Sequence, residues 1–319
     1  MKKIRLALLA GGVSSERSVS LNSGNQVFDA LDKHTYDIVR YDPKTDLKKL
    51  VMDAAEIDAA LIILHGPYGE DGTVQGLLDL LDIPYQGAGV LGSAVAMNKL
   101  LSKRLYDAAD IPTPAYRSVT ANGDIDIPGL IREIGLPLVV KPACAGSSVG
   151  MTIVKEASAM DQAIGEGFAH DDTLIVEAYV KGLELTCGVL GNEDLTALPV
   201  IEIIPGQGHE YFDFNAKYVA GETEEICPAR INDDLTRRVQ ELAVQSHQTL
   251  FLKGYSRTDM ILDGNDLFVL ETNTIPGMTA TSLYPQSAAV AGYSFSQLLD
   301  TLIQLAIEEH KNKTKRRNQ

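Results

Sequence analysis

Short apolar runs alternate with amphipathic stretches along the first hundred residues. A continuous apolar run is typical of a buried strand, whereas apolar positions three and four residues apart are typical of a helix. The predicted elements are strands at Ile4–Ala10, Tyr36–Tyr41, Ala59–Leu64 and near Pro84-Tyr85, and helices at Arg17–Leu31 and Thr73–Leu81. Strands that alternate with helices build a parallel sheet covered on both faces. We therefore predict an N-terminal α/β unit.

Beyond this unit the pattern changes to strands that follow one another with few helices between them. A helical stretch, Leu91–Asp110, ends at the proline-rich segment Ile111–Pro114. The later predicted elements are strands at Leu138–Lys141, Thr152–Lys155, Leu174–Glu177, Leu185–Leu190, Val200–Ile204, Tyr255–Leu262 and Leu267–Leu270, and helices at Ser158–Phe168, Asp233–Leu250 and Phe295–Ile307. A polar segment, Gly206–Glu225, interrupts the last unit.

The last two predicted strands carry the most informative chemistry. Arg257 and Asp259 lie two residues apart on the first strand. Glu271 and Asn273 have the same spacing at the end of the second. Because side chains alternate faces along a strand, and a Gly-Asn turn joins the strands into a hairpin, three oxygen-bearing side chains meet beside a guanidinium. Such hard ligands suit Mg²⁺, which completes its shell with water and substrate phosphates.

Composition and charge narrow the classes of protein. The chain has 319 residues, of which 45% are hydrophobic and 22% charged, as expected for a globular protein of about two or three domains. The net charge of -15 argues against a general nucleic-acid binder, which would present a basic face to phosphates. Three widely spaced cysteines without CxxC pairs exclude a disulfide framework and a zinc ribbon, and favour a reducing cytosol.

Neither end of the chain indicates a membrane. The start, Met1–Ala10, looks like a signal peptide, but Arg5 interrupts it and its apolar part is shorter than the roughly 7-residue minimum. No later apolar run reaches the ~18 residues of a membrane helix. We therefore expect a cytoplasmic protein with no membrane and no nucleic acid among its partners. The basic residues between Lys311 and Arg317 are expected to form a frayed, solvated terminus.

A glycine-rich loop, Ala145–Gly150, lies between two predicted strands. The pattern GxxxxGK[ST] is absent from the sequence, so the loop is not a Walker A motif. A hairpin of this kind can still cover a triphosphate with its N–H groups and hydroxyls, and Lys141 is placed to contact a phosphate. Taken alone, the loop is also typical of a flexible surface hairpin with a partly buried lysine. The oxygen cluster downstream is what favours a nucleotide.

Several other polar residues have two interpretations each. His65 follows a buried strand, where ligands bind in open parallel sheets, but it is also an ordinary loop histidine. Glu16 either stabilises a helix dipole or, like His65, binds the ammonium or carboxylate of a small zwitterion. The segment Gly206–Glu225 is either an ordinary mobile loop or a lid. Arg257 either pairs with the nearby acids or polarises a substrate oxygen in the transition state.

Together these motifs resemble the D-alanine–D-alanine ligases of the ATP-grasp superfamily. The matching motifs keep one order along nearly the whole chain, and they are Gly11–Ser20, His65–Gly76, Met97–Lys99, Lys141–Gly150, Lys217-Tyr218, Glu271–Leu283 and Ser294–Leu298. The resemblance implies an α/β fold (α+β overall), with a parallel-sheet substrate domain at 1–96 and a two-domain ATP-grasp fold at 97–183 and 184–319. The implied reaction joins two D-alanine molecules through an acyl phosphate, with ATP, for peptidoglycan precursor synthesis.

The resemblance also implies roles for single residues. The implied ATP contacts are Lys99, Lys141 and Lys217, the loop residues Gly146, Ser147 and Ser148, Glu177 and Val180 at the adenine, and Glu184 at the ribose. Two Mg²⁺ or Mn²⁺ ions are implied at Asp259, Glu271 and Asn273. The implied substrate contacts are Glu16, His65, Ser282 and Leu283, and the implied catalytic set is Glu16, Ser147, Tyr218, Arg257 and Gly277. A homodimer is implied as well.

Ala145 and Tyr218 are the two positions that bear on how closely the chain follows the family pattern, and two alternative functions remain. Ala145 departs from the family pattern, which often has Glu in this loop. Tyr218 matches members that make the dipeptide, since Phe at this position tends to accompany D-alanyl-D-lactate synthesis. The alternatives are another ATP-grasp carboxylate–amine ligase, with a different D-amino or hydroxy acid, and a non-catalytic nucleotide-binding protein. The second is disfavoured because Asp259, Glu271 and Asn273 are all present.

Overall fold

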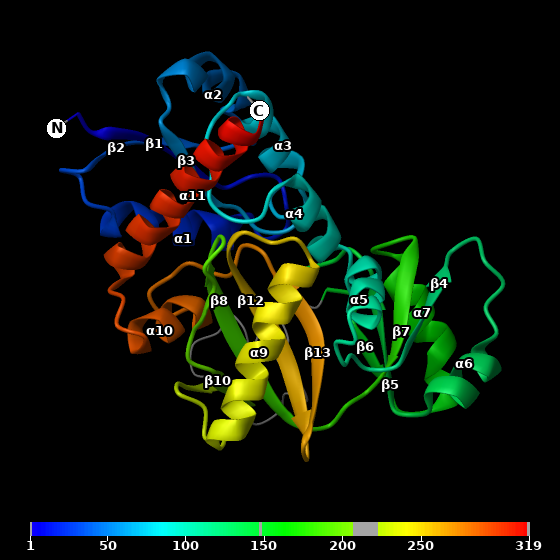
Figure 1. The fold of residues 1–319 in the computed structure, drawn as a ribbon. Coiled ribbons are helices and arrows are strands. Elements are labelled where there is room, and N and C mark those ends of the chain that lie inside the picture. Colours follow the sequence, from blue (N-terminus) through cyan, green and yellow to red (C-terminus); the bar gives the residue numbers. More distant parts are fainter. Residues whose placement is uncertain (1, 147–148, 207–222, 318–319) are drawn as a thin grey trace.

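The structure, a computed structural model, describes residues 2–146, 149–206 and 223–317. These residues form three sheets, one parallel and two antiparallel (Figure 1). The mixed architecture predicted from the hydrophobic pattern is therefore confirmed. Among the residues described, no helix is both long enough and apolar enough to cross a membrane.

The N-terminal sheet is parallel, with the strand order β2-β1-β3. Its strands are β1 (Ile4–Ala10), β2 (Tyr36–Tyr41) and β3 (Ala59–Ile63), and the helices around it are α1 (Arg17–Ala30), α2 (Leu47–Asp53), α3 (Thr73–Leu80) and α11 (Phe295–Arg317). Leu6 and Leu8 pack with α1 and α11, whereas Ala7 and Leu9 pack with α2 and α3. Alternate residues of one strand thus enter two cores, as predicted for a sheet covered on both faces. The predicted strand near Tyr85 is a single bridge to Ala60.

The small sheet lies to one side of the molecule and has the order β4-β7-β5-β6 (Figure 1). Its strands are β4 (Tyr116–Thr120), β5 (Leu138–Pro142), β6 (Thr152–Val154) and β7 (Thr173–Ala178), and its helices are α6 (Ile127–Ile134) and α7 (Met160–Phe168). β5 and β6 are antiparallel neighbours on either side of the glycine-rich loop. The predicted hairpin around this loop is confirmed.

The large sheet lies at the centre, with the order β11-β10-β8-β12-β13 and β9 paired to β8. Its elements are β8 (Leu183–Gly191), β9 (Thr196–Ala197), β10 (Ile201–Pro205), β11 (Thr223–Ile226), β12 (Gly254–Asp263), β13 (Asp266–Asn273), and the helix α9 (Asp233–Thr249). α9 covers one face through Val239 and Ala243, which pack on Leu185 and Met260. The opposite face of the large sheet is not covered by α9 and can therefore line a binding site.

The predicted helix Leu91–Asp110 is two helices, α4 (Val90–Met97) and α5 (Lys99–Ala108). The chain turns at Asn98, whose backbone is extended and whose side chain accepts a 3.0 Å hydrogen bond from the N–H of Leu101. Asparagine is a favoured residue at such a helix start. The break places Lys99 at the first position of a new helix.

The basic C-terminus is not a frayed end, so that prediction was wrong. α11 continues past the predicted end at Ile307 to Arg317 and lies along the N-terminal domain (Figure 1). Lys313 Nζ lies 3.5 Å from Asp79 Oδ1, and His310 Nε2 lies 3.4 Å from Asp82 Oδ1. These acidic partners come from another part of the chain, and they favour continuation of the helix.

Several short elements were not predicted, and they are α2, β4, α6, β9, β11 and α10 (Leu283–Val290). Most span only a turn or two of helix or a few strand residues, too short for a clear hydrophobic period. Of the predicted polar segment Gly206–Glu225, residues 207–222 lie outside the described residues. The lid remains a prediction.

Candidate functional site

Two adjoining cavities lie against the face of the large sheet that α9 does not cover. The large cavity, of about 450 Å³, lies between the N-terminal domain and the ends of β12 and β13. The small cavity, of about 130 Å³, lies between the small and large sheets. Lys99, Ala145 and Glu271 line both cavities, so groups bound in the two can meet there.

The small cavity has mostly apolar walls with polar groups at the edges. The apolar lining residues include Val139 and Ile153 of the small sheet, Val149 and Met151 of the segment before β6, and Ile203, Ile261 and Leu270 of the large sheet. Lys141, Glu177, Val180 and Glu184 line the same space. Four residues implied as nucleotide contacts are thus brought together, although they come from β5, β7, the following loop and β8. An apolar slot with a few polar groups suits a flat heterocycle.

Glu177 is the buried acid of the small cavity and has two lysine partners. Its carboxylate lies 2.8 Å from Lys103 Nζ and 2.5 Å from Lys141 Nζ. Burial by itself raises the pKa of Glu177, but the two lysine charges outweigh it and hold the pKa below its ordinary value. Sequence reasoning missed Lys103, which is fully buried. The available signal was its position four residues after Lys99 on one helix.

The hairpin of β12 and β13 has the predicted arrangement. Asp259 pairs with Glu271, and Arg257 pairs with Asn273, so all four side chains share one face. Arg257 Nε and Nη2 donate to the two carboxylate oxygens of Asp259, each at 2.8 Å. Asn273 Nδ2 donates to Asp259 Oδ2 at 3.0 Å. Lys99 Nζ lies 3.2 Å from Glu271 Oε2.

The oxygen donors of this hairpin fit a divalent cation that arrives with phosphates. Asp259 lines the small cavity, Asn273 the large one, and Glu271 both. Within the described part of the chain, no three His, Cys, Asp or Glu side chains gather to hold a metal by themselves. Two carboxylates and an amide oxygen would need water or phosphate oxygens to complete a shell, as is usual for Mg²⁺.

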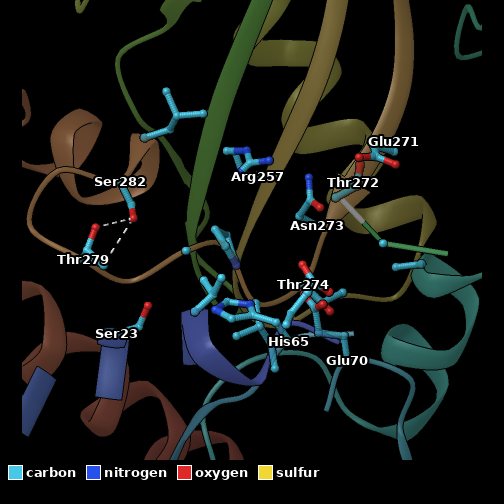
Figure 2. Close-up of a pocket in the computed structure, with 18 of the residues that line it drawn as sticks. Ser23, His65, Glu70, Arg257, Glu271, Thr272, Asn273, Thr274, Thr279 and Ser282 are labelled. Carbon is cyan, nitrogen blue, oxygen red and sulfur yellow. Dashed lines mark hydrogen bonds between the residues drawn. The ribbon is translucent and has the colours of Figure 1, made fainter. Parts of the chain in front are cut away.

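The large cavity gathers the residues expected to bind a small zwitterion. In Figure 2, Ser282 lies on one side, Glu271 on the other, Arg257 and Asn273 between them, and His65 below. Glu16 and His65 also line this cavity and are only 7% and 6% exposed. Burial lowers the pKa of His65, and Arg257 adds to the effect although Glu16 opposes it. The imidazole is therefore neutral at pH 7.

Two further carboxylates line the large cavity and were not singled out from the sequence. Glu70 accepts a 2.6 Å hydrogen bond from the N–H of Gly66, and burial together with Glu16 and Glu271 raises the pKa of Glu70 to about 8. Glu225 accepts a hydrogen bond from Gln286 Nε2, and burial raises its pKa as well. Glu70 lies within the motif His65–Gly76, which was the available signal. No sequence signal pointed to Glu225.

The far wall of the large cavity is a helix start close to a glycine. α10 follows Ser282, whose Oγ lies 2.7 Å from Thr279 Oγ1 (Figure 2). A Cβ on Gly277 would lie 3.0 Å from Ser282 Oγ, so the chain approaches this serine closely. Gly277, Ser282 and Leu283 all line the cavity. Backbone N–H groups at a helix start favour an anion such as a carboxylate.

The remaining predicted residues are Gly146, Ser147, Ser148, Lys217 and Tyr218. Gly146 lines the large cavity, and a Cβ on it would lie 3.0 Å from Glu16 Oε2. The glycine-rich loop therefore begins beside the acid that was expected to bind substrate. Ser147, Ser148, Lys217 and Tyr218 lie outside the described residues.

Comparison with known proteins identifies the family. The family model described as the D-ala D-ala ligase C-terminus matches residues 105–304, and that of the N-terminus matches residues 42–88. A D-alanine–D-alanine ligase of Syntrophobacter fumaroxidans is 58% identical over 97% of this chain and 99% of its own, and one of Desulfotalea psychrophila is 52% identical over 98% of each.

Solved structures agree with the sequence matches. The D-alanine–D-alanine ligase of Bacillus anthracis complexed with ATP has a TM-score of 0.86 and 35% identity, over 97% of this chain and 99% of that one. The enzyme of Coxiella burnetii has a TM-score of 0.85 and 29% identity, over 99% of this chain and 97% of that one. The chain belongs to the D-alanine–D-alanine ligase family.

Proposed function

We propose that this chain joins two D-alanine molecules into D-alanyl-D-alanine, with ATP converted to ADP and phosphate, for peptidoglycan precursor synthesis. The observation that carries the proposal is the position of Glu271 and its hairpin partners. They lie where an apolar cavity with nucleotide-type contacts meets a polar cavity with contacts for a zwitterion. A phosphoryl group held in one cavity can therefore reach a carboxylate held in the other.

ATP would occupy the small cavity. Its adenine would lie by Glu177 and Val180, and its ribose hydroxyls by Glu184. The phosphates would extend toward Lys99 and Lys141, with the glycine-rich loop residues Gly146, Ser147 and Ser148, and Lys217, as further contacts. The support for this orientation is that Lys99 lines both cavities whereas Val180 and Glu184 line only the small one.

Two Mg²⁺ or Mn²⁺ ions would be held at the junction, one by Asp259 and Glu271 and the other by Glu271 and Asn273. When bound, they neutralise charge on the phosphoryl oxygens of the nucleotide. The protein's own cations, Lys99 and Arg257, contact the same carboxylates and keep them oriented.

The two D-alanine molecules would share the large cavity. Glu16 would bind the ammonium of the first, beside His65, and the N–H groups at Ser282 and Leu283 the carboxylate of the second. The first carboxylate accepts the γ-phosphoryl group and becomes an acyl phosphate, which makes it a good electrophile. The amine of the second D-alanine then attacks the carbonyl carbon, and phosphate leaves.

Arg257 and the N–H of Gly277 would stabilise the oxyanion of this second step. Arg257 lies in the middle of the large cavity (Figure 2), between the carboxylate site and the hairpin junction. Donors already in place stabilise charge that develops in a transition state at little reorganisation cost. Ser147 and Tyr218 would connect Glu16 to a closing lid.

The remaining proposals concern organisation. We propose domain boundaries at 1–96, 97–183 and 184–319, supported by sheets whose strands span residues 4–63, 116–178 and 183–273. We also propose a homodimer, supported by apolar side chains exposed on the N-terminal domain, namely Val13, Leu47, Met52, Tyr68 and Leu80. A cytoplasmic location without membrane or nucleic-acid partners is consistent with the net charge of -15.

The test is ADP release with and without D-alanine, with the product identified by mass. We expect release that depends on D-alanine and a product with the mass of the dipeptide. Parallel assays with D-serine, D-lactate and L-alanine test the alternative second substrates. A preference for D-lactate or D-serine as second substrate would contradict the dipeptide product, and no release with any of them would contradict the ligase activity.

A further inference from the structure

We propose that Glu70 is the second carboxylate of the ammonium site, and that it acts together with Glu16 on the ammonium group of the first D-alanine. The proposal rests on the proposed function and deepens it, because it adds a recognition residue to the substrate site. Both carboxylates line the large cavity. Figure 2 shows Glu70 on the same side of the cavity as His65.

Gly66 brings the two carboxylates close together. Glu70 Oε2 accepts a 2.6 Å hydrogen bond from the N–H of Gly66. A Cβ built on Gly66 would lie only 2.9 Å from Glu16 Oε2. The two acids therefore approach a single residue, one at its nitrogen and one at its α-carbon. Gly66 has a φ of 69°, a conformation that side chains other than that of glycine rarely adopt.

Glu70 differs in its partner from the acids that contact a lysine or an arginine. Asp259 contacts Arg257, Glu271 contacts Lys99, and Glu177 contacts two lysines. The described hydrogen-bond partner of the Glu70 carboxylate is a neutral backbone N–H. The neighbouring His65 supplies no charge because its pKa is lowered. A charged Glu70 in this place is therefore stabilised by a cation that comes with a ligand.

An ammonium group matches what the two glutamates offer. It has three N–H donors and no acceptor, so one carboxylate leaves at least one donor for another partner. Two carboxylates on either side of Gly66 provide acceptors for more than one donor. Burial raises the pKa of Glu70 to about 8 and the charge of Glu16 adds to the effect, so a cation bound beside both carboxylates would favour their charged forms. A hydroxy acid has no such group, so the pair would also select an amino acid as first substrate.

The test uses the full-length enzyme with Glu70→Gln and Glu70→Asp. Initial rates of ADP release are measured over a range of D-alanine concentrations, from which separate KM values for the first and second D-alanine are obtained. We expect Glu70→Gln to raise the first KM by about 10- to 100-fold, as for a lost hydrogen bond between charged groups. The second KM and the KM for ATP should change by less than about 3-fold, and Glu70→Asp should recover part of the loss.

Glu241→Gln is the matched control, since Glu241 is an exposed residue of α9 outside both cavities.

D-Lactate is also tested as a competitor at the first site, and its inhibition relative to D-alanine should strengthen in Glu70→Gln. An unchanged first KM, or an equal rise in both D-alanine KM values, would overturn the assignment. If Glu70→Gln does not fold, the Glu70→Asp values decide. If wild type itself releases no ADP with D-alanine, the proposed function fails instead.

Discussion

Two glutamates, one in each cavity, have opposite electrostatic surroundings. Glu177 in the small cavity contacts Lys103 and Lys141, and its pKa is lowered in spite of burial. Glu70 in the large cavity accepts a hydrogen bond from a neutral N–H, and burial raises its pKa to about 8. The same side chain is thus held charged in one cavity and favoured as neutral in the other until a cation arrives.

The difference between the partners of Glu177 and Glu70 matches the charge of the ligand that each cavity is proposed to bind. A nucleotide is a polyanion, and the small cavity meets it with lysines that are already oriented by a buried acid. An amino acid brings an ammonium group, and the large cavity meets it with carboxylates that have neutral partners, Gly66 for Glu70 and Gln286 for Glu225. Glu177 therefore has lysine counter-ions from the protein, whereas the counter-ion of Glu70 would come with the ligand.

The largest effect is expected for Glu271→Gln, which tests whether the metal ions are held where the two cavities meet. Glu271 lines both cavities and is the shared ligand of the two proposed metal sites. We expect Mg·ATP-dependent turnover to be abolished while the fold is kept, as measured by ADP release and circular dichroism. Asp266→Asn, at the exposed start of the same strand, should be near wild type. Retained activity in Glu271→Gln would show that the metals are held elsewhere.

The charge balance of the small cavity is tested by Lys103→Met. The change leaves buried Glu177 with one cation, so we expect a loss of about 3 kcal/mol in the free energy of unfolding, measured with urea. Arg117→Met is the comparison, because it breaks an exposed pair with Glu133. Its expected cost is below about 1 kcal/mol. Equal losses in the two variants would mean that Lys103 does not balance a buried charge.

Arg257→Ala tests the catalytic side of the large cavity. Loss of an oxyanion donor usually lowers turnover by ~10²–10³-fold, and we expect at least this decrease with the fold intact. Arg132→Ala removes an exposed guanidinium and serves as the control. The measurement is kcat for ADP release at saturating ATP and D-alanine. A near-normal kcat would remove Arg257 from the mechanism and leave it as a partner of Asp259.

The smallest expected effect is on the stability of the ligand-free protein with Glu70→Gln. The folded state keeps a proton on Glu70 between its ordinary pKa of 4.5 and about 8, whereas the unfolded state releases it. Wild-type stability therefore falls as pH rises through this window. Because Glu70 is only half-buried, we expect Glu70→Gln to gain about 1–2 kcal/mol over wild type between pH 5 and pH 8. Parallel pH profiles of unfolding would contradict the raised pKa.

Features that depend on neighbouring residues were predictable from sequence. The face shared by Arg257, Asp259, Glu271 and Asn273 follows from strand alternation and a short turn, and the structure has this register. The parallel sheet at the start and the hairpin around the glycine-rich loop follow from similarly local patterns. The order of motifs along the chain was sufficient to identify the family.

Features that depend on distant segments were decided only by the tertiary structure. Lys103 is buried because Glu177, on another element, balances its charge, and α11 extends because acids of the N-terminal domain meet its basic end. The place of Glu70 depends on a loop that brings it and Glu16 to the same glycine. A sequence pattern reports the period of one element, whereas burial and charge balance arise from segments that meet only when the chain folds.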